Sequence, residues 1–476
     1  RILIMRRITS ILLVCCLLPL VAAAQLRLPS VIGDGMVLQR NSSVRLWGKA
    51  APSSQVRIAA GWAAEPVEAS ASHDGDWSAE IPTTEAGGPY TIEITSGTEQ
   101  HTLQNVLLGE VWICAGQSNM SMPVRGFESQ PIAGSLEAIV SSPCYPIRMY
   151  TADRTVSEHK EFNVKGRWME AGVATTGAFS AVGFFFARTL CQALNVPVGM
   201  INLSWGGSTA QAWSSQELLM QFPEIDTTMN MQSKSPQRIP SALHNAMFHP
   251  VTGYGVRGVI WYQGENNLRE PELYARLFPA MVREWRTKIG RGDIPFYYVQ
   301  IAPFDYGNAA GTEAAKLREA QARCRYTIPN SGMVVTIDLG EEKQIHYASK
   351  SEVGFRLGCQ ALAGTYGFGK LPHNGPVYRR WEKEGGRMIL TFDHAEGGLC
   401  LKPSQTTGFE IAGTDGRFIP ARAEVHPRNK KQIVIWSDEV TDPADVRYCF
   451  RNFAVGTLYD AYGLPAAPFR TDNYPR

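Results

Sequence analysis

The sequence lacks the patterns that mark several large classes of protein. It has no CxxC pair, and His244 and His249 are five residues apart, which is not a spacing that favours zinc. No stripe of lysine and arginine runs along the chain, and because phosphate binding needs such clusters we expect no nucleic-acid partner. There is no internal repeat and no low-complexity tract. These absences leave the globular enzymes and sugar-binding proteins as the main classes to consider.

Long hydrophobic runs are also scarce, and the clearest one is at the N-terminus. Arg6 and Arg7 precede the apolar residues 8–21, which end in three alanines at 22–24. This is the pattern of a secretory signal peptide over residues 1–24, cleaved after Ala24, and it is short for a bilayer span. We therefore expect a secreted or periplasmic protein with no integral membrane span after cleavage. Removal of residues 1–24 takes the formal charge of the protein from +2 to −1, because three arginines and no acidic residue are lost.

Cysteines are few, and outside residues 1–24 their number is odd. The seven are Cys114, Cys144, Cys191, Cys324, Cys359, Cys400 and Cys449. An odd number leaves at least one thiol free unless two chains are joined. Cys114, Cys191 and Cys359 lie in apolar patterns and are expected to be buried, whereas Cys400 and Cys449 could pair within the C-terminal segment.

The 476 residues are enough for two to four domains, and the hydrophobic pattern changes twice. Residues 25–104 contain short alternating stretches, at 43–48, 55–60 and 90–95, which predict a small antiparallel β-sandwich. In residues 105–369 buried strands alternate with amphipathic helices, which predicts a parallel sheet covered on both faces. Strand-like stretches return in residues 370–476, at 387–392, 432–436 and 446–450. For the central domain we expect strands at 106–115, 198–204, 256–262, 295–301 and 333–337, and helices at 180–194, 271–289, 312–326 and 349–366.

Polar residues follow four of the predicted central strands. The four clusters are Gly116-Gln117-Ser118-Asn119, Trp205-Gly206-Gly207-Ser208, Gln263-Gly264-Glu265-Asn266-Asn267, and Asp338 with His346 in the loop after it. In open α/β sheets ligands bind beyond the carboxyl ends of the strands, where these clusters would meet. The arrangement predicts a catalytic crevice at one edge of the sheet.

The residue types fit ester hydrolysis by a serine. Ser118 could attack an acyl carbon if an imidazole accepts its proton, and His346 is the only histidine in a strand-end loop of the central domain. The alternatives are a helix cap for Ser118 and a helix-entry or solvent-facing residue for His346. Backbone N–H groups at Ser118, Gly206 and Gly207 and the side-chain amide of Gln263 could stabilise an oxyanion. His244 and His249 precede the third strand and are expected to be structural.

Glu265 admits three roles. It could orient the neighbours of Ser118, bind a substrate hydroxyl, or simply be a carboxylate at the start of a helix, where the dipole favours it.

Four motifs in this order resemble those of the SGNH-type serine esterases, and most closely the sialate O-acetylesterase family. They are GQSNM at 116–120, NLSWGGS at 202–208, WYQGENN at 261–267 and IH at 345–346. Further stretches that look like this family are 28–40, 184–190, 243–250 and 353–357, so the resemblance covers nearly the whole mature chain. It implies an α/β fold, with a flavodoxin-like three-layer SGNH-hydrolase domain between N- and C-terminal antiparallel β modules.

The resemblance also implies an activity and roles for residues. It implies removal of O-acetyl groups from a small-molecule or glycan sugar, without cofactor or metal. Ser118 matches the nucleophile and His346 the base, while Gly207, or Gly206, and Gln263 match the oxyanion donors. Gln117 and Asn119 flank the serine and are assigned to the same oxyanion or substrate site.

The sequence departs from the family pattern before the histidine. Many relatives have an acidic residue shortly before it and a proline after it, whereas here residues 341–345 read Glu-Glu-Lys-Gln-Ile and Tyr347 follows. Asp338, Glu342 or a backbone carbonyl could therefore orient the imidazole, or Ser118 and His346 could act as a dyad. Two other functions remain open, a polysaccharide acetyl esterase such as an acetylxylan esterase, and a carbohydrate-binding protein without catalysis. The sequence makes no prediction of the oligomeric state.

Overall fold

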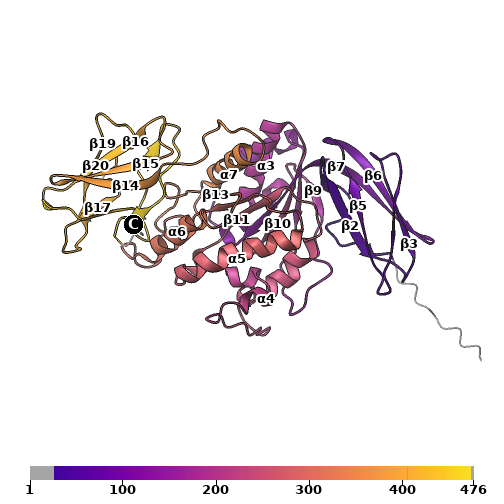
Figure 1. The fold of residues 1–476 in the computed structure, drawn as a ribbon. Coiled ribbons are helices and arrows are strands. Elements are labelled where there is room, and N and C mark those ends of the chain that lie inside the picture. The colour runs from indigo at the N-terminus through magenta and orange to yellow at the C-terminus, as the bar shows by residue number, and fades with distance from the viewer. Residues whose placement is uncertain (1–25, 405, 473–476) are drawn as a thin grey trace, which may run out of the picture.

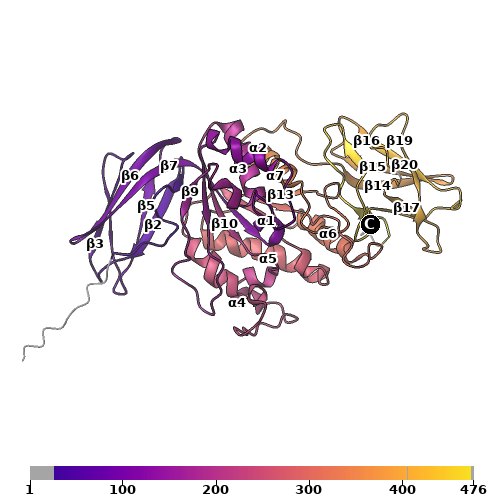
Figure 2. The same cartoon turned by 180° about the vertical axis from the view of Figure 1, so that it is seen from behind.

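The computed structural model describes residues 26–404 and 406–472, which form three parts in a row (Figure 1). A central α/β domain lies between an N-terminal and a C-terminal β domain, as the view from behind also shows (Figure 2). The predicted signal peptide lies outside the described residues. Within those residues no helix is both long enough and apolar enough to cross a membrane.

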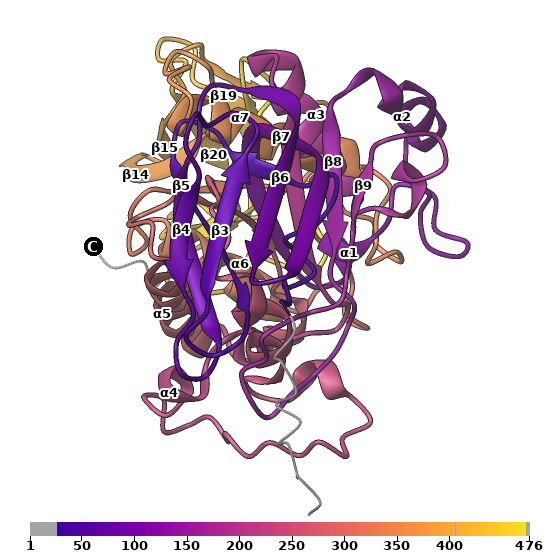
Figure 3. The same ribbon diagram turned by 90° about the vertical axis from the view of Figure 1, so that its right-hand side faces the viewer.

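The N-terminal domain is built from two antiparallel sheets (Figure 3). One pairs β2 (Ser43–Lys49) with β5 (Asp76–Pro82). The other contains β4 (Val67–Ser70), β3 (Gln55–Ala60), β6 (Gly87–Ser96) and the start of β7 (Glu99–Gly116), with β1 (Val37–Gln39) added parallel to β7. Side chains of β2 alternate between exposed and buried along the strand. This alternation packs one face on the core, and the expected N-terminal antiparallel β module is confirmed.

The long strand β7 joins the first two domains. Its first part pairs antiparallel with β6, and from Glu110 onward it pairs parallel with β10 and β11 in the central sheet. The boundary predicted between residues 104 and 105 therefore falls inside a continuous strand and not in a linker. The nucleophile candidate follows this strand directly.

The central sheet has the strand order β13-β12-β11-β7-β10-β8-β9. The strands are β8 (Ile147–Thr151), β9 (Trp168–Glu170), β10 (Val198–Ser204), β11 (Gly258–Tyr262), β12 (Phe296–Val299) and β13 (Ser331–Val334). All neighbours are parallel except β9, which runs antiparallel to β8. Strands β7 and β10 to β13 have the flavodoxin-like order 2-1-3-4-5, as the resemblance implies. Strand β8 and the edge strand β9 were not predicted.

Helices cover both faces of this sheet (Figures 1 and 2). Helices α3 (Ala181–Leu194) and α7 (Lys350–Gly364) pack together on one face, and α5 (Pro271–Ile289) and α6 (Glu313–Cys324) on the other. Along β7, Trp112 and Cys114 enter the core beneath α3 and α7, whereas Ile113 enters the opposite core. A strand buried on both faces reads as one continuous apolar run, which is why it could be recognised in the sequence. Three short helices complete the domain, α1 (Ser118–Ser121), α2 (Ser135–Ser141) and α4 (Gln216–Leu219).

The C-terminal domain is antiparallel. One sheet has the order β14-β15-β20-β19 and another the order β18-β17-β21-β23, while β16 pairs with β22. Their bounds are β14 Val377–Glu384, β15 Arg387–Asp393, β16 Leu399–Leu401, β17 Phe409–Ala412, β18 Ile419–Pro420, β19 Arg422–Val425, β20 Gln432–Trp436, β21 Asp445–Tyr448, β22 Leu458–Asp460 and β23 Phe469–Arg470. Cys400 is exposed and Cys449 buried, and both are free, so the pairing considered for them is wrong.

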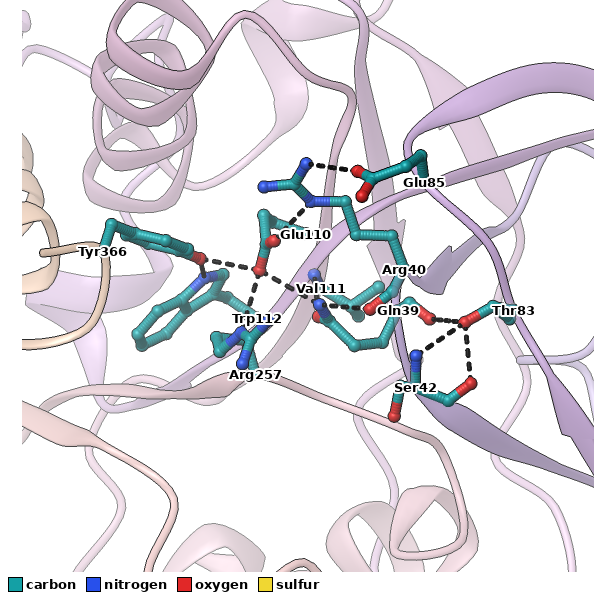
Figure 4. A network of polar contacts seen from close by, with 10 residues as sticks. All are labelled: Gln39, Arg40, Ser42, Thr83, Glu85, Glu110, Val111, Trp112, Arg257 and Tyr366. Atoms are coloured by element: carbon teal, nitrogen blue, oxygen red, sulfur yellow. Dashed lines mark hydrogen bonds and ion pairs between the residues drawn. The ribbon is translucent and has the colours of Figure 1, made fainter.

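A buried carboxylate, Glu110, holds the N-terminal domain against the central one (Figure 4). It accepts hydrogen bonds from Arg40 Nε at 2.8 Å, Arg257 Nε at 3.1 Å and the Tyr366 hydroxyl at 2.8 Å. Gln39 Nε2 also donates to it, at 3.1 Å. Burial alone would raise the pKa of Glu110, but the charge of Arg257 and these hydrogen bonds outweigh it and leave the pKa below its ordinary value.

Replacing this carboxylate should destabilise the protein. We expect Glu110→Gln to lower the free energy of unfolding by roughly 2–3 kcal/mol at neutral pH, because two arginines lose their buried anion while remaining partly in water. Because the pKa of Glu110 is lowered on folding, its stabilisation is full above the ordinary value of 4.5 and is lost as the pH falls below it. The difference between the variant and the wild type should shrink correspondingly in acid.

Urea denaturation at pH 7 and at pH 4 measures this effect. Glu85→Gln is the matched control, since Glu85 pairs with the same Arg40 at 3.6 Å but has a side chain that is 80% exposed. It should change the free energy of unfolding by less than about 0.5 kcal/mol. Equal losses in the two variants would contradict the assignment of Glu110 as the holding residue.

Candidate active site

Three of the predicted clusters begin side by side at the carboxyl edge of the central sheet. Gly116 at the end of β7 is in register with Ser204 of β10 on one side and with Tyr262 of β11 on the other. Trp205 N donates to Gly116 O at 3.0 Å, and Gln117 N donates to Tyr262 O at 2.9 Å. In the flavodoxin-like strand order this is the switch point, where ligands bind.

Ser118 begins α1 directly after a sharp turn. Gly116 has a φ of 135°, and a Cβ there would collide with the Tyr262 carbonyl, so only glycine fits between the strands. Ser118 is half-buried, and its Oγ makes no hydrogen bond within the described residues. Its hydroxyl is therefore not used as a helix cap, which was the structural alternative.

The Gly206–Gly207 turn lies against Ser118. A Cβ on Gly206 would be 3.3 Å from Ser118 Cβ, and Gly207 has a φ of 78°. In the part of the chain that the structure describes, the N–H groups of Gly206 and Gly207 donate no hydrogen bond. Gly206 thus places an unused backbone donor beside the serine and Gly207 follows with a second, and an oxyanion site requires such donors.

His346 lies in the loop between β13 and α7, with its imidazole half-buried. Its Nδ1 is 2.9 Å from Gln130 Oε1, and its ring packs edge-on against Phe127 at 5.1 Å between centroids. Because an amide oxygen only accepts, Nδ1 carries the hydrogen and Nε2 keeps its lone pair. Burial and the nearby charge of Lys350 lower the pKa of His346 to about 4, so the ring is neutral at pH 7.

Asn119 ties the histidine loop to the serine. Its Nδ2 donates to Ile345 O at 3.2 Å and to Glu265 Oε1 at 2.6 Å. The residue after Ser118 thus contacts the residue before His346. No hydrogen bond joins Ser118 Oγ to His346 among the described residues, and such bonds are often formed only once substrate is present.

Asp338 does not orient His346, so this prediction is wrong. Both of its carboxylate oxygens are bound by Arg356 of α7, at 2.8 and 2.7 Å. An arginine fork satisfies a carboxylate in two parallel bonds, and this pair is buried at the base of the loop. The acceptor at His346 Nδ1 is the neutral amide of Gln130.

Gln263 is not free to bind an oxyanion, which is a second correction. Its side chain is buried, and Nε2 donates to Ser208 O at 3.2 Å and to Asn267 Oδ1 at 2.8 Å. Both amide hydrogens are used, so Gln263 fixes the two loops that flank Ser118.

Gln117 and Asn119 also lie below the surface, where they hold loops and do not face a substrate. The side-chain oxygen of Gln117 accepts from Gly264 N at 3.1 Å and from Asn266 N at 3.4 Å. The carboxyl group of Glu265 is buried, and it holds the amide of Asn119. Burial raises the pKa of Glu265, against the opposing effect of that hydrogen bond. Of the three roles considered for Glu265, the hydrogen bond to Asn119 supports the orientation of Ser118's neighbours, while Glu265 also begins the helical turn Glu265–Asn267 and lines the hollow described below.

Comparisons with known proteins identify the family. Residues 108–364 match the family model described as "Carbohydrate esterase, sialic acid-specific acetylesterase". The chain belongs to this family. It is 29% identical over 485 residues to human sialate O-acetylesterase, with 93% of this chain and 92% of the human protein covered. The mouse enzyme is 28% identical over 457 residues, covering 83% and 84%.

A solved structure supports this assignment over nearly the whole chain. The crystal structure of a carbohydrate acetylesterase from Xanthomonas citri is 32% identical, with a TM-score of 0.85, and covers 94% of this chain and 100% of that one. The resemblance drawn from the motifs is therefore confirmed, as is the α/β fold. As a member of this family the protein is a carboxylic ester hydrolase.

Two glutamines near the esterase site were not predicted. Gln130 lies in the loop between α1 and α2 and follows none of the predicted strands, so nothing in its sequence context pointed to the histidine. Gln237 lies with its Nε2 3.1 Å from where a Cβ of Gly207 would be, and the neighbouring Arg238 Nε donates to Gly207 O at 3.3 Å. Gln237 belongs to a single helical turn, Pro236–Arg238, which the periodicity of the sequence could not reveal.

A polar hollow of about 630 Å³ opens beside this turn in the esterase. Its polar lining residues are Thr209, Gln211, Glu224, Asp226, Arg238, Glu265, Asn266, Arg269 and Glu270. Over residues 26–404 and 406–472, no group of three or more His, Cys, Asp or Glu side chains is arranged to hold a metal ion. His244 is fully buried against Phe248, as expected of a structural residue.

Proposed function

We propose that this esterase is a secreted enzyme that removes O-acetyl groups from sugars, with O-acetylated sialic acid as its substrate. Ser118 forms an acetyl-enzyme and His346 moves the protons. The observation that carries the proposal is the convergence of three segments: Gly206 lies against Ser118, and Asn119 contacts the residue before His346. The names of the curated relatives support the sugar class, and the pattern of residues 1–24 supports secretion.

The first half of the reaction acylates the serine. His346 Nε2 removes the proton of Ser118 Oγ, which attacks the acetyl carbonyl carbon. The negative oxygen that forms accepts hydrogen bonds from the N–H groups of Ser118 and of Gly206 or Gly207. The bond from the carbonyl carbon to the sugar oxygen then breaks, and Nε2–H returns the proton to that oxygen, releasing the sugar alcohol.

The second half releases acetate by the same groups. Nε2 takes a proton from a water molecule, whose oxygen attacks the acetyl carbon, and Ser118 Oγ leaves with the proton. In both halves Gln130 Oε1 accepts from Nδ1–H and so keeps the lone pair on Nε2. A neutral amide stabilises the imidazolium less than a carboxylate does, but it fixes the same tautomer.

The polar hollow beside Gly207 is the proposed place for the sugar. Thr209, two residues after the glycine turn, lines it, and so does Arg238, whose Nε donates to Gly207 O. Its amide, guanidinium, carboxylate and hydroxyl groups are of the kind that hydrogen-bond sugar hydroxyls.

Acetate release from two natural substrates tests the proposal. With purified enzyme, we expect kcat/KM for O-acetylated sialic acid to exceed that for acetylated xylan by at least about tenfold, a difference of about 1.4 kcal/mol in transition-state binding. A higher rate on acetylated xylan would assign the enzyme to polysaccharide instead. Binding of either sugar without acetate release, from these substrates or from 4-nitrophenyl acetate, would contradict catalysis altogether.

A further inference from the structure

The backbone on both sides of His346 is held by buried side chains. Before the histidine, Asn119 Nδ2 donates to Ile345 O at 3.2 Å. After it, Lys350 Nζ donates to Tyr347 O at 2.7 Å and lies 3.5 Å from the centre of the Tyr347 ring. Asn119 and Lys350 are both buried almost completely. The Tyr347 hydroxyl is itself fixed by a hydrogen bond to the Tyr262 hydroxyl at 2.9 Å, which links the loop to β11.

We infer that Lys350 and the pair Asn119–Glu265 are positioning residues that clamp the histidine loop against Ser118, and that the charge of Lys350 opposes protonation of the imidazole. This inference rests on the proposed roles of Ser118 and His346. None of the three side chains has a part in the proton transfers themselves.

The Asn119 side of the clamp depends on a buried carboxylate. Glu265 Oε1 accepts from Asn119 Nδ2 at 2.6 Å, and Glu265 Oε2 has no hydrogen-bond partner among the described residues. A carboxylate that accepts from an amide holds it more firmly than a neutral acceptor would. The amide can then reach the Ile345 carbonyl with its second hydrogen, which brings the loop to the serine.

On the Lys350 side of the clamp, the charge of the ammonium group acts on the imidazole of His346. This ammonium lies against the Tyr347 ring, and its charge interacts with the carboxylates of Glu265 and Glu341 and with His346. The hydroxyls of Tyr262 and Tyr306 face Glu265. Burial lowers the pKa of Lys350 to about 7, against the opposing attraction of Glu265 and Glu341. Lys350 is therefore positive over the acid range in which His346 takes up its proton, and like charges disfavour that protonation.

The pH dependence of kcat/KM tests the charge. Its acid limb reports the pKa of the base in the free enzyme. With 4-nitrophenyl acetate as substrate and acetate release as the readout, we expect Lys350→Met to move this limb to higher pH by roughly 0.5–1 unit, because the imidazole protonates more easily without the ammonium. Lys343→Met is the matched control: Lys343 precedes His346 by three residues, but it is 75% exposed and pairs with Asp305. It should leave the limb in place.

A second variant tests the clamp independently of the charge. Asn119→Ala should lower kcat by about 10–100-fold and change KM less than about threefold, because the base is misplaced while the sugar site is kept. An unmoved acid limb in Lys350→Met, or an equal shift in Lys343→Met, would overturn the role of the charge. An unchanged kcat in Asn119→Ala would overturn the clamp. Absence of ester hydrolysis by the wild type would instead reject the proposed function, so the two failures are distinct.

Discussion

Substituting Ser118 with alanine is expected to lower kcat for acetyl ester hydrolysis by about 10⁴-fold or more. The acetyl-enzyme needs the Oγ atom, which lies beside the Gly206–Gly207 turn whose N–H groups donate no hydrogen bond within the described residues. Ser118 Oγ makes no hydrogen bond within the described residues, so the free energy of unfolding of the variant should lie within about 0.5 kcal/mol of the wild-type value. Acetate release and urea denaturation measure the two quantities.

Ser121→Ala is the control for this experiment. Ser121 lies one turn further along α1, and its Oγ donates to Ser118 O at 3.3 Å. It shares the helix but is not part of the proposed chemistry, and its kcat should stay within about threefold of the wild type. Wild-type turnover in Ser118→Ala would remove this serine from the mechanism.

The second large effect is expected at the base. His346→Ala should lower kcat/KM by about 10³–10⁴-fold, because the serine hydroxyl is a weak nucleophile until its proton is accepted. Imidazole added to the assay should restore part of the rate in this variant, since the ring left a space between Phe127 and Gln130. The exposed His159 gives a control, and His159→Ala should behave as wild type.

Gln130→Ala separates orientation from proton transfer. The substitution leaves the imidazole in place but removes the acceptor at Nδ1, so the wrong tautomer becomes accessible. We expect kcat/KM to fall by about 10–50-fold. A loss as large as that of His346→Ala would mean that the amide has a part in the chemistry itself. If His346→Ala hydrolysed the ester at the wild-type rate and added imidazole did not change that rate, the role of His346 as the base would be contradicted.

The strands and helices that could be predicted are those in which one pattern of buried and exposed side chains holds along the whole element. The predicted strand 198–204 and the predicted helix 271–289 match β10 and α5, the first a run of buried residues and the second amphipathic. Strands β8 and β9 were missed because each mixes charged with apolar residues, Ile-Arg-Met-Tyr-Thr and Trp-Met-Glu, and neither forms a continuous apolar run. β7 was recognised only over its last part, because its first residues alternate in burial whereas residues 106–116 are buried on both faces and read as one apolar run.

In the site, the positions of residues along the sheet edge could be predicted, but the hydrogen-bond partners of their side chains could not. The motifs placed Ser118, the glycine turn and the loop of His346 at one edge, because parallel strands deliver their carboxyl ends there. Residue type did not reveal which partner each side chain has. Asp338 has the right chemistry to orient a histidine, yet Arg356 binds it, and Gln130 reaches His346 across 216 positions of sequence. Such pairings depend on how loops pack, which local patterns do not encode.

Labelling with an organophosphate serine probe tests the central claim most directly. After treatment of the intact enzyme, mass spectrometry of its peptides should show a single adduct on Ser118, formed much more slowly in His346→Ala and absent from Ser118→Ala. Loss of acetate release should follow the extent of labelling in the same sample. An adduct on a different residue, or full hydrolysis by enzyme that is completely labelled on Ser118, would contradict the account.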